Sequence, residues 1–298
     1  MWIFLALLSA ILLGVYDILK KFSLRDNPVF LVLLISTFTG ALIFLPAVVM
    51  SGLFPEYAVQ QFWYIAPANI RTHGLIGVKS CIVGASWVLS YYAVKYLPLT
   101  IVSPIRSTGP LWTLIGALVI FGERLNPLQW VGLAASLTCF WLFSQAGRKE
   151  GFSFRNNRWI WCIYAGTLLG SISGLYDKYL LAHYDRMVVQ AYFSLYLVPV
   201  ILPFVLFKWL PSRKQQPLHW RYTIPLIGIC LTLADYVYFY ALSFPDSLVS
   251  IVSTVRRCSV VVPFLAGTIL LHEKNIRRKA LCLLGMLIGI GIIIWGSK

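Results

Sequence analysis

The sequence predicts an all-α integral membrane protein with ten transmembrane helices, built as two inverted five-helix repeats. Composition predicts the class: of 298 residues, 59% are hydrophobic and 12% are charged, and the mean hydropathy is +0.79. A soluble domain carries about 25% charged residues. Apolar runs of roughly 18 to 25 residues recur along the chain, and each can cross a hydrocarbon core of about 30 Å. An internal repeat predicts the arrangement.

Each predicted span is an apolar run bounded by proline or polar clusters. The first run lacks the basic start and cleavage site of a signal peptide and continues into Lys20 and Lys21, so we interpret it as a span. Residues 55–73 are too polar to span, and Trp63 and Tyr64 are typical of an interfacial segment. The predicted spans are residues 2–20, 29–50, 75–96, 100–121 and 128–144, then 159–181, 188–209, 223–242, 248–271 and 280–295.

The two halves of the chain repeat each other. Gly14-Val15-Tyr16-Asp17 matches Gly174-Leu175-Tyr176-Asp177, and Val102-Ser103-Pro104-Ile105-Arg106 matches Val252-Ser253-Thr254-Val255-Arg256. Five spans per half is an odd number, so the second copy enters the bilayer upside down. We therefore expect repeats over residues 1–150 and 151–298, with a substrate site near the midplane between them.

A hairpin motif carries a family resemblance. Phe121-Gly122-Glu123-Arg124-Leu125, followed by Trp130-Val131-Gly132-Leu133, resembles the EamA signature of the drug/metabolite transporter superfamily, and Leu271-His272-Glu273-Lys274 with Leu283-Leu284-Gly285 echoes it. The resemblance covers essentially the whole chain. It implies a secondary transporter that works by alternating access. It leaves the substrate open, because such families move amino acids, sugars, nucleotide-sugars, phosphorylated metabolites and lipid-linked precursors.

Loop charges predict an orientation. The formal net charge is +15, and most basic residues fall in alternate loops, which anionic lipid and topology explain without nucleic acid. The positive-inside rule makes those loops cytoplasmic and places both termini outside, whereas proteins that this chain resembles usually have both inside. We expect the bacterial cytoplasmic (inner) membrane. The basic-side residues are Lys20, Lys21, Arg25, Arg148, Lys149, Arg155, Arg158, Arg213, Lys214, Arg221, Lys274, Arg277, Arg278 and Lys279.

Several ionisable residues lie inside the predicted spans, where each costs a few kcal/mol without a partner or function. Depth and repeat symmetry predict two ion pairs, Asp17–Arg106 and Asp177–Arg256, acting as alternating gates. A purely structural role for these pairs stays open.

Three further charges are left over from this pairing scheme. Arg257 and Lys79 outweigh Asp235, which favours an anionic substrate held by guanidinium groups. Arg256-Arg257 also resembles, in part, the phosphate-binding lysine–arginine pair of plastid phosphate translocators. Aromatic residues proposed to line the cavity, with packing as the alternative, are Trp87, Tyr91, Tyr176, Tyr236 and Tyr240.

Other polar residues have structural interpretations. Lys178 is expected to extend toward the membrane interface. Glu123 and Glu273 lie at helix–helix turns and are expected to cap helices or to have another structural role common to the family. The four histidines and six cysteines show no metal-ligand spacing, and no nucleotide-binding loop or nucleophile motif is present. We therefore expect no enzyme activity and no cofactor. An ion gradient or exchange would drive transport, with Asp17, Asp177 or Asp235 as candidate proton carriers.

The sequence favours a transporter or exchanger of an anionic, phosphorylated or carboxylated metabolite. Three alternatives stay open: a flippase of a lipid-linked phosphate, an exporter of amino acids or similar metabolites, and a non-transporting membrane partner subunit. In the exporter, Asp235 would hold the ammonium and Arg257 the carboxylate.

Overall fold

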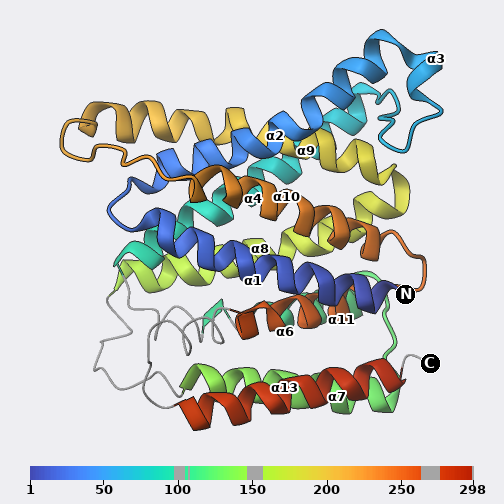
Figure 1. Ribbon diagram of the computed structural model, residues 1–298. Helices are drawn as coiled ribbons and strands as arrows, with labels where there is room; N and C mark the ends of the chain where they lie inside the picture. The colour runs from blue at the N-terminus through green and yellow to red at the C-terminus, as the bar shows by residue number, and fades with distance from the viewer. Residues whose placement is uncertain (97–104, 107, 146–156, 263–275, 297–298) are drawn as a thin grey trace.

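The computed structural model describes residues 1–96, 105–106, 108–145, 157–262 and 276–296, and within these ranges the regular structure is entirely helical (Figure 1). The main helices run roughly parallel to one another. They are α1 (Trp2–Leu24), α2 (Val29–Leu53), α4 (Ile70–Tyr96), α6 (Gly109–Ile120), α7 (Pro127–Gln145), α8 (Arg158–His183), α9 (Arg186–Phe204), α10 (Thr223–Leu242), α11 (Val249–Arg257) and α13 (Ile276–Gly296). Short elements are α3 (Pro55–Ala58), a π-helix at Val205–Trp209, and 3₁₀ turns at Leu210–Ser212 and Cys258–Val260.

Five helical segments of the described chain are long and apolar enough to cross a membrane: Trp2–Leu24, Val29–Leu53, Ile70–Ala93, Arg186–Ser212 and Thr223–Leu242. α6 and the segment Leu284–Gly296 are shorter apolar helices. Large apolar side chains point outward on many helices, including Phe207 at 78% and Trp161 at 67% exposure. Outward apolar surface of this extent fits lipid as the solvent. The chain is therefore an integral membrane protein, as the sequence predicts.

Most predicted spans correspond to a helix, with three instructive differences. Residues 70–73, expected in the interfacial segment, belong to α4, because the Asn69 side chain accepts hydrogen bonds from the Thr72 amide and hydroxyl at 2.8 Å and starts the helix early. The seventh span changes to a π-helix after Pro203, whose ring removes a backbone donor. The fourth and ninth spans are described in part, and their described helices include α6 and α11, the latter with its 3₁₀ turn.

The helix packing has an internal two-fold symmetry. In span order, the counterparts in the two halves are α1 and α8, α2 and α9, α4 and α10, α6 and α11, and α7 and α13. Contacts made by helices of the first half recur between their counterparts: α4 packs on α8 and α9, and α10 packs on α1 and α2. Likewise, α6 packs on α8 and α11 packs on α1. α2–α9, α6–α11 and α7–α13 pair each helix with its own counterpart. Counterparts also run in opposite directions, as α1 and α8 do in Figure 1. This is the packing expected of inverted repeats, although the predicted boundary at residue 150 lies outside the described residues.

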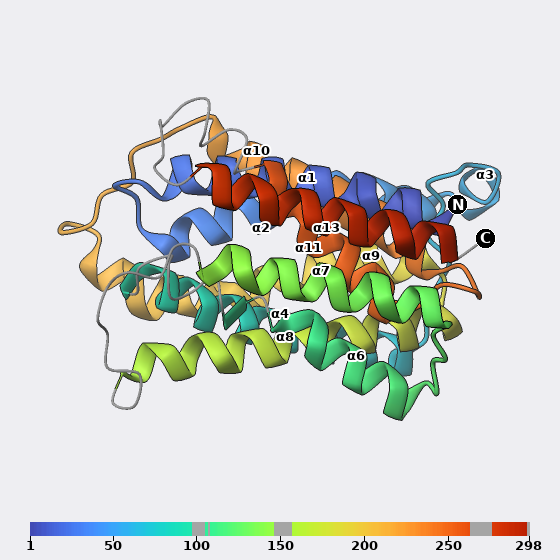
Figure 2. The same cartoon turned by 90° about the horizontal axis from the view of Figure 1, so that it is seen from below.

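α7 and α13 form a separate layer and pack mainly on each other, side by side in both views (Figures 1 and 2). Small residues allow their close approach. A Cβ added at Gly132 would lie 2.6 Å from the Gly289 carbonyl oxygen, and one at Gly289 would lie 2.3 Å from the Ser136 hydroxyl. Small residues four apart on both helices are a usual route to tight association in lipid.

Two polar contacts fix helix ends across the bundle. The buried Glu123 carboxylate accepts hydrogen bonds from the Val249 amide at 2.6 Å and from the Ser250 hydroxyl, so it caps α11, which confirms its predicted role. Lys178 donates to the Ser247 carbonyl and hydroxyl, both at 2.6 Å. These acceptors lie in the loop between α10 and α11, and the expectation that Lys178 extends toward the membrane interface stays a prediction. Glu273 lies outside the described residues.

Candidate substrate cavity

A cavity of about 260 Å³ lies between the two halves of the bundle. Its walls come from α1, α4, α8, α10 and α11, with single residues from α6 and α9, and none from α2, α7 or α13. These are the helices that carry the intramembrane charges. The position between repeats is the one that an inverted-repeat fold provides for a substrate.

Three carboxylates line the cavity, and each has a cationic partner. Asp177 pairs with Lys79, and Asp235 pairs with Arg256. The Lys79 and Asp177 side chains are 1% and 7% exposed, and the Lys79 ammonium also lies 4.3 and 4.2 Å from two aromatic ring centres, those of Phe193 and Phe239. This pair is therefore sealed inside the protein, where an unpaired charge would be very costly.

The third carboxylate pairs within its own helix. Asp17 lies 3.1 Å from the Lys20 ammonium, one turn further along α1. The two side chains are 30% and 15% exposed, so this pair is more solvated than the buried pair of Lys79. Lys20 also lies 4.7 Å from the Tyr16 ring centre, and the Tyr16 hydroxyl is 3.3 Å from that of Tyr91.

These pairings correct the predicted gates. We expected Asp17–Arg106 and Asp177–Arg256, whereas Asp177 pairs with Lys79 and Asp17 with Lys20. The expected scheme used depth along each span and repeat symmetry. Packing decides instead, because α4 lies against α8 and brings Lys79 to Asp177. Lys79 and Asp235, expected to be left over, are therefore both paired.

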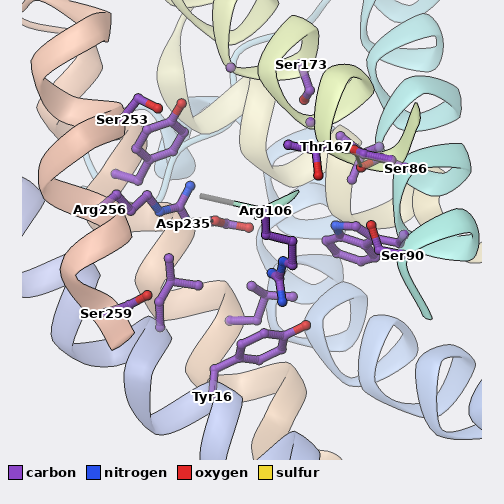
Figure 3. Close-up of a pocket in the computed structure, with 18 of the residues that line it drawn as sticks. Tyr16, Ser86, Ser90, Arg106, Thr167, Ser173, Asp235, Ser253, Arg256 and Ser259 are labelled. Atoms are coloured by element: carbon purple, nitrogen blue, oxygen red, sulfur yellow. Dashed lines mark hydrogen bonds and ion pairs between the residues drawn. The ribbon is translucent and has the colours of Figure 1, made fainter. Parts of the chain in front are cut away.

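Arg106 and Arg257 are the cavity cations without an ion-pair partner among the described residues. Arg106 lies just before α6, and Arg257 ends α11. The Arg257 guanidinium packs on the first turn of α6, since a Cβ at Gly109 would be 3.0 Å from its Nη2. Figure 3 shows Arg106 extending across the cavity toward Tyr16. Within the described part of the chain, these two unpaired guanidinium groups give the cavity an excess of positive charge.

The rest of the wall is rich in small polar residues. On one side of the cavity, Ser86 and Ser90 from α4 face Thr167 and Ser173 from α8, while Ser253 and Ser259 lie on the opposite side (Figure 3). Glycines at every fourth position of α8 also line it: Gly166, Gly170 and Gly174. Hydroxyl groups and exposed backbone make this wall suited to hydrogen bonding.

The cavity has a more accessible end and a sealed end. It extends from Leu24 and Lys20, near the basic loops at the end of α1, to the Lys79–Asp177 pair deeper in the bundle. Asp17 is 30% exposed, whereas Lys79 is 1% exposed. The part of the cavity near the end of α1 is thus more solvated than the part at the Lys79–Asp177 pair.

Most predicted site residues meet at this cavity. Those that line it are Arg257, Arg256, Arg106, Lys79, Asp235, Trp87, Tyr91, Asp17 and Asp177. Three tyrosines lie elsewhere. Tyr176 donates a hydrogen bond to the Leu75 carbonyl at 3.2 Å, and the Arg186 guanidinium lies 5.2 and 4.0 Å from the ring centres of Tyr236 and Tyr240. These three have the packing role that was the alternative interpretation.

Sequence reasoning missed the hydroxyl-bearing wall and two tyrosines. Tyr238 packs against the Arg256 guanidinium at 4.0 Å and lies two residues from Tyr236 and from Tyr240, on another face of α10. Tyr16 precedes Asp17 within a repeated motif, which was an available signal. The four-residue glycine spacing in α8 was another signal, because it marks a helix face that a neighbour or a ligand approaches closely.

A helical membrane protein with a charged cavity between two inverted halves has the architecture of a secondary transporter. The chain belongs to the EamA-like transporter family, whose model matches residues 1–145 and again residues 157–295. A solved structure described only as "Crystal structure of protein" is similar in fold, with a TM-score of 0.75 and 14% identity, covering 98% of each chain. No curated protein matches the chain.

Proposed function

We propose that the protein is a secondary transporter or exchanger of a small anionic metabolite, carrying a phosphate or carboxylate group, and that it works by alternating access. In this proposal all ten predicted helices span the bacterial cytoplasmic membrane, with the basic loops in the cytoplasm and both termini outside. It acts as a transporter and not as an enzyme, and it needs no cofactor. Its partners are the anion, membrane lipids, and a coupling proton or a counter-substrate.

The charge balance of the cavity carries the proposal. Five cationic side chains and three carboxylates line it, and each carboxylate pairs with a lysine or with Arg256. Arg106 and Arg257 remain, and a guanidinium binds phosphate or carboxylate through two parallel hydrogen bonds. An anion placed between them would neutralise charges that are costly to keep within the membrane.

The sealed end of the cavity supports alternating access. The buried Lys79–Asp177 pair joins α4 of the first half to α8 of the second. Its separation, with opening of the same helices, would expose the site on the side away from the basic loops. In this account the structure is the state open to the cytoplasm.

The exporter alternative is less well supported. It requires a free Asp235 carboxylate for the substrate ammonium, but Asp235 pairs with Arg256, whose guanidinium also packs on Tyr238. Both partners are only partly exposed, at 16% and 19%. Binding an ammonium would require breaking this pair.

Transport in reconstituted vesicles tests the proposal. Vesicles are loaded with unlabelled glycerol 3-phosphate or with unlabelled gluconate, and uptake of the same compound in labelled form is measured. At least one of the two compounds should be exchanged. Arg257→Gln should weaken binding by about 1.5–3 kcal/mol, or roughly 10- to 150-fold, because a charge-assisted hydrogen bond is lost. Arg213→Gln, an exposed arginine in the basic loop, is the matched control. Exchange of neither compound, or equal exchange by Arg257→Gln, would contradict the proposal.

A second cavity favours a flippase of a lipid-linked phosphate as the other candidate function. It measures about 160 Å³ and lies between the start of α2, the end of α4 and the π-helix, with Lys208 and Trp209 in its wall. Tyr91 borders both cavities. A headgroup could thus approach the central cavity from the side. Transfer of a labelled lipid-linked phosphate between leaflets, without exchange of soluble anions, would favour this candidate.

A further inference from the structure

Several serines of the central cavity have no hydrogen-bond partner in the described part of the chain. Ser90 on α4, Ser173 on α8 and Ser259 after α11 all line the cavity, and none has a partner among the described residues. The hydroxyls of Ser86 and Thr167 differ, because they donate to the carbonyls of Gly166 and Ile163 at 2.7 Å. Three hydroxyls on three elements are thus free both to donate and to accept.

The glycines of α8 keep this wall open. A Cβ at Gly166 would lie only 2.6 Å from the Ser90 hydroxyl, so a larger residue would displace that serine. A Cβ at Gly174 would be 3.6 Å from the Tyr238 hydroxyl. The glycines therefore leave hydroxyl groups, and not alkyl side chains, at the surface of the cavity.

Part of the apolar lining of the cavity is covered by a charged group. Two of the largest apolar side chains, Phe193 and Phe239, are covered by the Lys79 ammonium at 4.3 and 4.2 Å. The other apolar lining residues are Leu13, Leu24, Val83, Trp87 and Leu231. A hydrocarbon skeleton would thus leave polar groups unpaired, whereas a hydroxylated skeleton would satisfy them.

We propose that the substrate is a polyhydroxylated anion, with its charged group at Arg106 and Arg257 and its hydroxyls at Ser90, Ser173 and Ser259. This inference rests on the proposed anion transport and narrows it to a substrate class. Phosphate esters of polyols and sugar acids share this chemistry. The hydroxyl groups, and not the charge alone, set the selectivity of the cavity.

Matched ligands separate recognition of the charged group from recognition of the hydroxyl groups. Binding of glycerol 3-phosphate is compared with propyl phosphate, and binding of gluconate with hexanoate, by ligand-induced stabilisation of the purified protein. In at least one pair the hydroxylated member should bind ten times more tightly or better, since each hydrogen bond contributes up to about tenfold and polar sites reject analogues that leave them unpaired. The pair that shows the preference identifies a phosphate or a carboxylate as the charged group.

Serine variants test the assignment of the hydroxyl site. The triple substitution Ser90→Ala, Ser173→Ala and Ser259→Ala should abolish most of the preference while leaving the affinity for the unhydroxylated anion within about threefold. Ser36→Ala is the control, because that hydroxyl donates to the Leu33 carbonyl at 2.9 Å, away from the cavity.

The outcomes distinguish this inference from the proposed function. Equal affinity of the native protein for both members of each pair overturns the hydroxyl site and leaves anion binding intact. Binding of none of the four ligands overturns the anion proposal itself. A preference that persists unchanged in a folded triple variant overturns the assignment to these serines.

Discussion

Removing one member of the Lys79–Asp177 pair should destabilise the protein strongly. Asp177→Asn leaves the Lys79 ammonium 1% exposed, with two aromatic rings beside it and no carboxylate. An uncompensated buried charge costs about 3–5 kcal/mol. The ring contacts of Lys79 are present in the native protein as well, so they do not offset this cost, and the expected loss is about 3–5 kcal/mol. Reversible unfolding in mixed detergent micelles, followed by circular dichroism, measures it.

A double substitution separates pairing from packing. Lys79→Met with Asp177→Asn removes both charges, so it should be more stable than either single variant and close to the native protein. Asp17→Asn is the comparison variant, because its pair with Lys20 lies within one helix and is more solvated, so its loss should cost less than the loss of the Lys79 pair. A single variant of Asp177 as stable as the comparison variant, or a double variant no better than both singles, would refute the account of a sealed pair.

Three further predictions concern packing and capping. Gly132→Ala should destabilise by about 1–3 kcal/mol through a clash with α13, while Gly291→Ala, where a Cβ meets open space, should be neutral or stabilising; thermal unfolding compares the two. Glu123→Ala should cost about 0.5–2 kcal/mol by removing the cap of α11, whereas the exposed Glu56→Ala should cost little in the same assay. Tyr236→Phe should bind the transported anion as tightly as the native protein does, since this ring packs on Arg186 outside the cavity. A tenfold loss of affinity would show that Tyr236 contacts the anion.

Much of the fold could be predicted because each helix that crosses the bilayer must be a long apolar run. Apolar runs predicted the helices to within a few residues, and the eighth span matches α10 at Thr223–Leu242. Deviations arose where local chemistry overrides hydropathy. Asn69 starts α4 early, and Pro203 precedes a π-helix that no hydropathy window detects.

Candidate site residues were easier to find than their partners. A charge inside a span is conspicuous, so Arg106, Arg257 and Lys79 were identified from sequence, and all line the cavity. Pairing depends on which helix faces which. Repeat symmetry fixed the counterparts of each residue but not the contact of α4 with α8 that joins Lys79 to Asp177.

Serines and tyrosines could not be ranked from sequence for a related reason. They occur on every face of these helices, and only packing decides which face a cavity. Tyr236 and Tyr240 carried the same signal as Tyr238, yet only Tyr238 lines the cavity. Ser90 and Ser173 were indistinguishable from serines such as Ser36, whose hydroxyl is bonded to its own helix.

Calorimetric titration of the purified protein with glycerol 3-phosphate and gluconate, in native form and as Arg106→Gln, Arg257→Gln and Arg213→Gln, tests the central claim most directly. The account predicts binding of at least one anion by the native protein and by Arg213→Gln, with about 10- to 150-fold weaker binding by either cavity variant. Equal affinity across all four proteins, or no binding of either anion by the native protein, would contradict it.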